Sequence, residues 1–327
     1  MNALPRKPRI LALSGGVGGA KLARGLTREL SVDELIVVCN TGDDFEHLGL
    51  TVCPDLDSVL YAVAGLADDA RGWGRADETW NFLDALRAMD GESWFQLGDR
   101  DLAQHVQRSA WLRSGLSLSE VTARLGRAHG VRHSIVPMCD EPVRTQLRTA
   151  EGWLDFQDYF VRRRAAPLVH DLRYVGAAAA RASLAWPAIE PQLDAIVICP
   201  SNPYLSIDPI LAVPDWHSRV RERRAPVVAV SPIVAGDALK GCAAKMLREF
   251  GLAVNPVSIA RHYGELLDAL VIDSQDAKYA NEIEQLGLAV HVTQTVMRND
   301  DDRGGLARTV LDFARGLRAR SLASRRA

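Results

Sequence analysis

Short apolar runs alternate with amphipathic stretches along much of this chain. Continuous apolar strands of this kind are buried on both faces, as in parallel sheets whose strands are joined by crossover helices. The pattern therefore predicts an α/β fold with a Rossmann-like, doubly wound and mostly parallel sheet. Six runs are expected to be its strands, at residues 9–14, 35–39, 195–199, 227–230, 270–272 and 289–292.

The middle of the chain has a different pattern. From about residue 61 to residue 181 it is typical of helices, and Ser117-Leu-Ser-Glu120 has the spacing of a capping box. Two segments, 143–148 and 153–160, flank the turn 150–152 and predict a β-hairpin. We expect this region to form an inserted, mainly helical lobe that contains a β-hairpin.

These patterns divide the chain into two parts. Residues 1–60 and 190–327 are expected to form a Rossmann-like nucleotide-binding core, and residues 61–189 an inserted lobe that encloses the substrate. In open α/β sheets the ligand binds outside the carboxyl ends of the strands. We therefore expect the lobe to lie over that edge of the sheet.

A glycine-rich turn follows the first predicted strand, with the sequence Ser14-Gly-Gly-Val-Gly-Gly-Ala-Lys21. Glycines let the backbone approach a ligand closely, and the free N–H groups at the start of the next helix favour an anion. The turn is not a P-loop, because Ala20 precedes Lys21 and no Ser or Thr follows. We expect it to bind phosphate; a tight strand-to-helix turn without a ligand is the alternative.

Carboxylates gather after the second predicted strand. Asp43 and Asp44 closely follow Asn40, and Asp57 ends the run Pro54-Asp-Leu-Asp57. Carboxylates in strand-end loops are costly unless they are solvated, paired or bound to a cation. Magnesium takes one or two of them together with substrate phosphate oxygens, which makes a metal site our expectation. The alternatives are an ordinary turn and, for Asp57, the N-cap of a helix over 58–67.

Two further loops follow predicted strands at the same edge. They are Pro200-Ser-Asn-Pro203 and Ser231-Pro-Ile233. Ser201 and Asn202 can hydrogen-bond a phosphate or a base, and turn formation is the alternative. Lys240 lies near a predicted helix start, where it would face either phosphates or solvent.

Two features of the middle region are open to more than one interpretation. Leu97-Gly-Asp-Arg-Asp101 is either a substrate clamp or a helix cap with a local ion pair. The aromatic residues Trp153, Phe156, Tyr159 and Phe160 would stack a flat heteroaromatic ring. The apolar face of a hairpin has the same composition, so we interpret them as core packing.

Composition narrows the classes of function. The 39 basic and 41 acidic residues nearly cancel, so the overall charge does not favour nucleic acid or an anionic membrane. The five cysteines are scattered without a Cys-x-x-Cys pair, which indicates reduced thiols rather than zinc or disulfides. No apolar run approaches the ~20 residues that span a bilayer, and 10–13 is too short for a signal peptide. We expect a cytoplasmic protein with small-molecule partners.

Taken in order, the motifs resemble the CofD-like family, the 2-phospho-L-lactate transferases of coenzyme F-420 biosynthesis. The resemblance covers nearly the whole chain and rests on the ordered set, since each motif alone is weak. The motifs are Ser14–Lys21, Asn40-Thr-Gly-Asp-Asp44, Pro54-Asp-Leu-Asp57, Leu97-Gly-Asp-Arg-Asp101, Pro200-Ser-Asn-Pro203, Ser231-Pro-Ile233 and Lys240-Gly-Cys-Ala-Ala-Lys245, where Cys242 replaces the usual proline.

The resemblance implies a magnesium-dependent enzyme, with Mg²⁺ as cofactor, that takes a small phosphorylated acid from guanosine diphosphate. The terminal ribityl hydroxyl of the deazaflavin Fo would attack the phosphorus that bears the acid, and GMP would leave. On the family pattern Asp57 is the metal-site carboxylate and the predicted catalytic residue. We expect a homodimer whose nucleotide site comprises Gly15, Gly16, Gly18, Gly19, Lys21, Asn40, Asp43, Ser201, Asn202, Ser231 and Lys240.

The resemblance does not identify which acid the donor carries, and two other functions have to be considered. Relatives use phospholactate, phosphoenolpyruvate or 3-phosphoglycerate, which differ only by a methyl, a methylene or a hydroxymethyl group. The alternative function is a regulatory nucleotide-sugar-binding protein of the related gluconeogenesis-factor type, which has a similar glycine turn. A nicotinamide oxidoreductase is disfavoured, because Asn40 replaces the expected acidic residue and Lys21 the third glycine.

Overall fold

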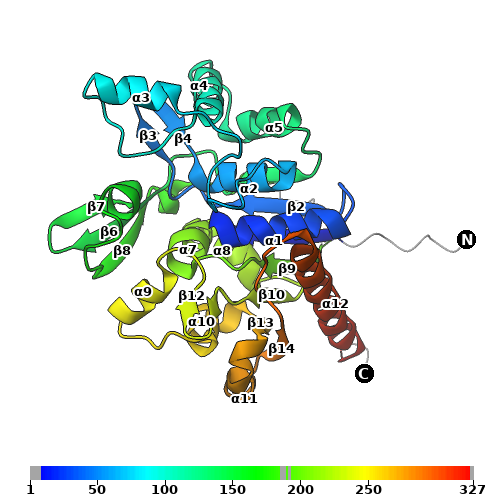
Figure 1. Ribbon diagram of the computed structural model, residues 1–327. Coiled ribbons are helices and arrows are strands. Elements are labelled where there is room, and N and C mark those ends of the chain that lie inside the picture. Colours follow the sequence, from blue (N-terminus) through cyan, green and yellow to red (C-terminus); the bar gives the residue numbers. More distant parts are fainter. Residues whose placement is uncertain (1–8, 185–188, 191–192, 325–327) are drawn as a thin grey trace, which may run out of the picture.

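Seven strands form the central sheet of the computed structural model, which describes residues 9–184, 189–190 and 193–324. Neighbouring strands are parallel, in the order β14-β13-β10-β9-β1-β2-β5 (Figure 1). The predicted Rossmann-like α/β sheet is confirmed, and all six predicted strands are present. The strands are β1 (Arg9–Ser14), β2 (Leu35–Cys39), β5 (Ser134–Pro137), β9 (Leu193–Ile198), β10 (Val227–Val230), β13 (Ala269–Asp273) and β14 (Ala289–Thr293).

Alternate residues of each strand pack into two hydrophobic cores, one on each face of the sheet. In β1, Ile10 and Ala12 belong to one core, and Leu11 and Leu13 to the other. Because helices cover both faces, the sheet is doubly wound. The first core includes α1 (Gly16–Glu29), α2 (Pro54–Ala64), α5 (Leu118–Ala128) and α12 (Asp300–Ser324). The second includes α7 (Asp208–Ala212), α8 (Pro214–Arg221), α9 (Ala243–Glu249), α10 (Pro256–Tyr263) and α11 (Ala280–Glu284).

The middle region contains the predicted helices and the predicted hairpin. Ser117 and Glu120 form the expected capping box of α5, and β6 pairs antiparallel with β7. A third strand, which the sequence pattern did not predict, pairs with the other side of β6. The elements are α3 (Asn81–Ala88), α4 (Asp99–Arg113), β6 (Arg144–Thr149), β7 (Gly152–Asp155) and β8 (Asp171–Val175).

The second hairpin strand is shorter than predicted. Strand β7 ends at Asp155, and the chain then turns into a short π-helix, η1 (Asp158–Arg162). Phe156 and Phe160 stack on each other with ring centroids 5.3 Å apart. Residues four apart in a strand would lie about 13 Å apart, so the helical turn is what lets these rings meet.

Strand β5 corrects the prediction that the middle region lies outside the sheet. It falls within residues 61–189, yet it pairs with β2 as an edge strand of the central sheet. Its four residues are too few for a strand period to stand out from the helical sequence around them. The division at 61–189 stays a prediction, and its second boundary adjoins residues 185–188 and 191–192, outside the described residues.

The carboxyl ends of the central strands carry the additional elements. The chain leaves β1 for β2 on one side and later returns to β9 on the other, which creates a crevice at the carboxyl edge. In Figure 1 the β3–β4 hairpin and the β6–β8 sheet lie left of the central sheet. The short hairpins are β3 (Phe45–His47) with β4 (Leu50–Val52), and β11 (Ile233–Val234) with β12 (Asp237–Ala238).

The structure also tests two expectations from the composition, on membrane-spanning segments and on the cysteines. No helix in the described part of the chain is long and apolar enough to cross a membrane. The five cysteines all lie within the described residues, where they are buried and form no disulfide. Their thiols are therefore packing groups of the core.

Candidate active site

The glycine turn joins β1 to α1 and lies against two other segments. Gly15 N–H donates to Ser201 Oγ at 3.2 Å, and the Ser201 hydroxyl donates to Gly15 O at 2.7 Å. A Cβ on Gly15 would collide with the Asp55 carboxylate and with Ser206. Gly16 has a φ of 63°, the left-handed conformation that glycine adopts without strain. The turn therefore brings the β9 loop and the start of α2 together.

Gly18 and Gly19 are required by close packing. A Cβ on Gly18 would collide with the backbone carbonyl of Pro200, and one on Gly19 with the hydroxyls of Ser201 and Ser14. Close packing in a tight turn, the alternative to phosphate binding, is thus enough to explain why glycine occupies these two positions. Contact between these glycines and a phosphate stays a prediction.

Three side chains from two segments, the loop after β2 and the start of α2, meet at the glycine turn. Asp55, in the first turn of α2, accepts a hydrogen bond from Gly16 N–H at 2.6 Å. Asn40, directly after β2, donates its Nδ2 amide to Asp55 Oδ2 at 3.0 Å. The same amide lies 3.4 Å from Asp43 Oδ1. The structure therefore places two carboxyls and one amide beside the start of α1, all of them buried.

Burial dominates the pKa values of the three carboxyls at the turn, Asp43, Asp44 and Asp55, although Arg144 lowers the pKa values of Asp43 and Asp44. Burial raises the pKa of Asp55 to about 6 and that of Asp44 to about 7. The pKa of Asp43 is raised well above its usual value by burial and by the neighbouring carboxyls Asp55 and Asp44. One oxygen of Asp44 has no hydrogen-bond partner although it is buried. A group of buried carboxyls with raised pKa values is typical of a functional site.

The residues at the turn fit a magnesium ion. Asp43 and Asp55 offer the carboxylate oxygens that hard cations prefer, whereas the Asn40 amide oxygen already accepts from Gly42 N–H at 2.7 Å. Magnesium is commonly held by one or two carboxylates together with phosphate oxygens of the substrate. A bound cation would also remove the cost of burying two close carboxylates, which the raised pKa values report.

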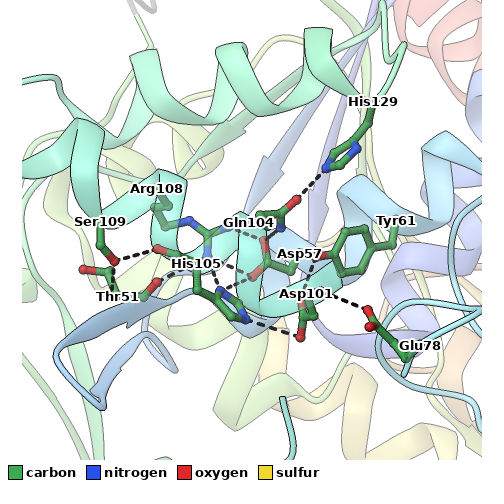
Figure 2. Close-up of polar contacts among 10 residues, drawn as sticks. All are labelled: Thr51, Asp57, Tyr61, Glu78, Asp101, Gln104, His105, Arg108, Ser109 and His129. Atoms are coloured by element: carbon green, nitrogen blue, oxygen red, sulfur yellow. Dashed lines mark hydrogen bonds and ion pairs between the residues drawn. The ribbon is translucent and has the colours of Figure 1, made fainter. Parts of the chain in front are cut away.

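Asp57 lies elsewhere, and the N-cap alternative for it is wrong. Helix α2 starts at Pro54 with Cys53 as its N-cap, so Asp57 belongs to the first turn. Residues two apart in a helix point about 200° apart, so Asp57 points away from the side that carries Asp55. Its carboxylate is bound by both Nη atoms of Arg108 and by Gln104 Nε2, at 2.5 Å (Figure 2). The catalytic role of Asp57 stays a prediction.

Arg108 and Gln104 belong to a polar network between α2 and α4. His105 Nδ1 lies 3.1 Å from Arg108 Nη1, and its Nε2 lies 3.3 Å from Asp101 Oδ2. Tyr61 Oη donates to the other Asp101 oxygen at 2.5 Å (Figure 2). Burial would raise the pKa of Asp101, but hydrogen bonds from His105 and Tyr61 bring it below its usual value.

The Leu97–Asp101 segment joins this network at the start of α4, and its role as a substrate clamp stays a prediction. Asp99 starts α4 and accepts hydrogen bonds from Phe82 N–H and the Asn81 side chain. Asp101 faces inward to Tyr61 and His105. Asp99 therefore caps the start of α3 and not that of α4, whose first N–H groups, at Arg100 and Asp101, donate to Glu78.

Two predicted lysines lie beside a different loop. Lys21 Nζ donates to the carbonyl of Met297 at 3.1 Å, and its pKa is lowered by burial and by the cations Arg303 and Lys240. A Cβ on Gly72 would overlap Lys240 Nζ, so this ammonium lies against the loop after α2. Lys21, Gly72 and Arg303 line one pocket. The lysines thus form a cationic group on the pocket side of α1.

Asn202 and Ser231 have partners within their own turns. Asn202 Oδ1 accepts from Tyr204 N–H at 3.0 Å and from Leu205 N–H at 3.3 Å. The Ser231 hydroxyl bonds both the N–H and the carbonyl of Ile233 at 3.1 Å. These are the turn contacts named as the alternative. Nucleotide binding by either residue stays a prediction.

The aromatic residues of the hairpin region are only partly packed as the core-packing interpretation expects. Tyr159 is fully buried, whereas Trp153 is exposed and stacks with the Arg173 guanidinium 4.2 Å from its ring centroid. A different aromatic group, not predicted from the sequence, lies at the β3–β4 hairpin next to Asp44. It consists of Phe45, His47, Trp94 and Phe95, with Phe45 and Phe95 ring centroids 4.8 Å apart.

Asp55 is the main site residue that the sequence interpretation passed over. The signal was present: Pro54 is suited to the first position of a helix. A helix starting there puts Asp55 and Asp57 on different sides of its first turn. Arg108 carried no comparable signal, because nothing in its local sequence indicates that it is buried opposite Asp57.

Comparison with known proteins decides the family. A family model described as 2-phospho-L-lactate transferase CofD matches residues 10–303. The chain belongs to that family. The predicted family and its transferase function in coenzyme F-420 biosynthesis are thus confirmed, and the regulatory alternative is not favoured.

Individual relatives match almost end to end. A phosphoenolpyruvate transferase of Kitasatospora aureofaciens is 38% identical over 317 residues, covering 95% of this chain and 99% of the relative. A 2-phospho-L-lactate transferase of Methanosarcina mazei is 34% identical, covering 92% and 99%. The solved structure of protein BH3568 from Bacillus halodurans, 16% identical, has a TM-score of 0.61 over 94% of this chain and 100% of its own. That last likeness concerns the fold alone.

Proposed function

We propose that this transferase moves a phospho-acid group from a guanosine-diphosphate-activated donor to the deazaflavin Fo and releases GMP. Relatives named phosphoenolpyruvate transferases are 34–38% identical to the chain, and those named 2-phospho-L-lactate transferases 34–36%. The two relatives at 38% carry the first name. We therefore name phosphoenolpyruvate as the first acid to test, with phospholactate and 3-phosphoglycerate as the others.

The single observation that carries the proposal is the group of buried carboxyls at the glycine turn. Asp43 and Asp55 share the Asn40 amide, and Asp55 also accepts the first N–H of α1. Gly15, the N-cap of α1, provides no side-chain cap, so first-turn N–H groups beyond Gly16 remain for an anion. A diphosphate and a cation would thus be held side by side.

The reaction forms one bond and breaks one. The ribityl hydroxyl oxygen of Fo bonds to the phosphorus that bears the acid, and the bond from that phosphorus to the GMP oxygen breaks. The hydroxyl proton needs an acceptor, and Asp44 suits this role because it has a free buried oxygen and a pKa of about 7. Magnesium, when bound, supplies positive charge to the phosphate oxygens on which negative charge grows.

The remaining assignments are part of the same proposal. Asp43 and Asp55 would hold the magnesium, with Asn40 orienting them. Lys21 and Lys240 would face the diphosphate from the pocket side of α1, which their shared cationic surroundings support. Homodimer formation and a cytoplasmic location stay predictions.

The test is a reaction with Fo, magnesium and each of the three activated acids, with product masses read by mass spectrometry. We expect the phosphodiester of Fo and one acid, together with GMP in equal amount. Asp55→Asn is the matched negative control, because it removes one charge and keeps the side-chain volume. If no donor yields a product while a nucleotide sugar binds tightly, the proposal is wrong.

A further inference from the structure

The ion pair between Asp57 and Arg108 lies on the far side of the helix turn that carries Asp55. We propose that Asp57 is a positioning residue, which acts through Arg108 to hold Asp55 in the metal site and does not itself bind the metal. The inference rests on the proposed function, since it takes Asp43 and Asp55 as the metal carboxylates. It gives a physical role to a network that the reaction itself does not use.

The geometry fixes α2 from both sides. On one side, Asp55 accepts hydrogen bonds from Gly16 N–H and the Asn40 amide. On the other, Asp57 is bound by both Nη atoms of Arg108 (Figure 2). A bidentate pair between Arg and a carboxylate fixes orientation as well as distance. Any rotation of this first turn would therefore strain both sets of contacts.

The partners of Asp57 are themselves held in place. Gln104 Oε1 is bonded to His129 Nε2 at 2.5 Å, which links α4 to the end of α5. Ser109, next to Arg108, accepts from Thr51 N–H of β4 at 2.8 Å. Figure 2 shows Gln104 and Arg108 of α4 bonded to the Asp57 carboxylate, with the outer contacts to His129 and Thr51 on either side. Helix α4 thus forms a rigid support against which α2 is aligned.

A metal at Asp57 itself is the competing interpretation. Among the described residues, Asp57, Asp101 and His105 do place potential ligand atoms within 4.8 Å of one another. However, Arg108 is buried to 1% exposure and already neutralises Asp57. A second cation beside a buried guanidinium would be repelled, so this group is an ion-pair network. Asp55, by contrast, has no cationic side chain among its contacts within the described part of the chain.

The two interpretations predict opposite effects of removing Arg108. If Asp57 were a metal ligand, Arg108→Gln would free its carboxylate and leave metal binding unchanged or tighter. If Asp57 positions Asp55, the same change loosens α2 and weakens metal binding. Changes to groups that orient metal ligands typically weaken affinity by about 10–100-fold.

The experiment measures Mn²⁺ binding to the full chain without substrates, by electron paramagnetic resonance of the free ion. We expect Arg108→Gln to weaken Mn²⁺ binding by about 10–100-fold, and Arg108→Lys, which keeps the charge and so protects folding, to weaken it less. Asp57→Asn combined with Arg108→Gln should bind no more weakly than either single variant, because the pair acts as a unit. Circular dichroism confirms that each variant folds.

The control is Arg113→Gln, which removes an exposed arginine from the same helix and should leave Mn²⁺ affinity unchanged. Unchanged or tighter Mn²⁺ binding by folded Arg108→Gln or Arg108→Lys would overturn the inference. Asp55→Asn separates this failure from that of the proposed function. If Asp55→Asn binds Mn²⁺ like the unaltered protein, the metal assignment is wrong and the inference with it; if only the Arg108 variants bind normally, the inference alone is wrong.

Discussion

Asp55 and Asp57 are two residues apart in one helix turn, yet their surroundings differ in almost every respect. Asp57 is matched by a buried guanidinium and an amide. Asp55 meets only neutral donors and another carboxyl, and its pKa rises to about 6. A buried carboxylate with a full set of partners stabilises the scaffold. A buried carboxylate without a cationic partner, such as Asp55, can still bind a cation. The side of α2 that carries Asp55 is therefore the side that we assign to the active site.

The largest expected effect is the loss of turnover when the Asp55 carboxylate is made neutral. Asp55→Asn should lower turnover by at least about 100-fold, as loss of a group that stabilises transition-state charge typically does. It should not destabilise the fold, since it removes a buried charge that has no cationic partner. Steady-state rates with Fo and the active donor, with thermal melts alongside, measure both. Turnover within a factor of two of the unaltered enzyme would remove Asp55 from the site.

A smaller effect, on the free energy of unfolding, is expected when a side chain is added at Gly15, next to Asp55. In Gly15→Ala the new Cβ would collide with the Asp55 carboxylate and Ser206. Forcing extra volume into a packed site costs about 1–3 kcal/mol. The backbone at Gly15 is extended (φ −160°), so the cost arises from the collision and not from strain. Urea unfolding gives the free energy of unfolding.

Gly316→Ala is the matched control for that variant, because a Cβ there meets nothing within 4 Å and Gly316 lies within α12. It should be neutral or stabilising by up to about 1 kcal/mol. Equal losses of stability in both variants would contradict the packing argument at Gly15.

The smallest expected effect is a dependence of magnesium stabilisation on pH. The folded-state pKa values of Asp44 and Asp55, about 7 and about 6, lie above the ordinary value. Between about pH 4 and 7 the unfolded chain has lost these protons and the folded chain has not, so their contribution to stability falls as pH rises. Magnesium should offset this loss at pH 8, by about 2 kcal/mol at ~30 times its dissociation constant. At pH 5 it should stabilise little.

Differential scanning calorimetry with and without magnesium at the two pH values tests this. Calcium and potassium at equal ionic strength serve as controls for ion size and for general screening. Stabilisation by magnesium that is equal at pH 5 and pH 8 would show that the cation binds away from these carboxyls.

The sequence predicted the sheet far better than the site. Strands such as Leu35–Cys39 are short, apolar and buried on both faces, so their pattern is local and their edges are clear. Strand β5 was not recognised, because its four residues give too little pattern. The site depends on which side of a helix turn each carboxylate faces. The sequence prediction started this helix at Ser58, whereas α2 starts at Pro54. That difference moves Asp55 and Asp57 from the preceding loop and the N-cap into the first turn.

Other parts of the site depended on contacts between distant segments. Arg108 meets Asp57 across 51 positions and Ser201 meets Gly15 across 186. Local pattern carries no information about such pairs. The glycine-rich segment was predicted correctly as the turn between β1 and α1, but the collisions at Gly18 and Gly19 show packing contacts that the sequence did not predict.

The most direct test of the account is turnover as a function of magnesium concentration in Asp55→Asn and Asp57→Asn, each against the unaltered enzyme. The account predicts that Asp57→Asn requires about 10–100-fold more magnesium and regains most of its turnover when saturated. Asp55→Asn should remain inactive at every magnesium concentration. The reverse order, with Asp55→Asn restored by magnesium and Asp57→Asn not, would show that the metal lies on the Asp57 side of the helix and would contradict the account.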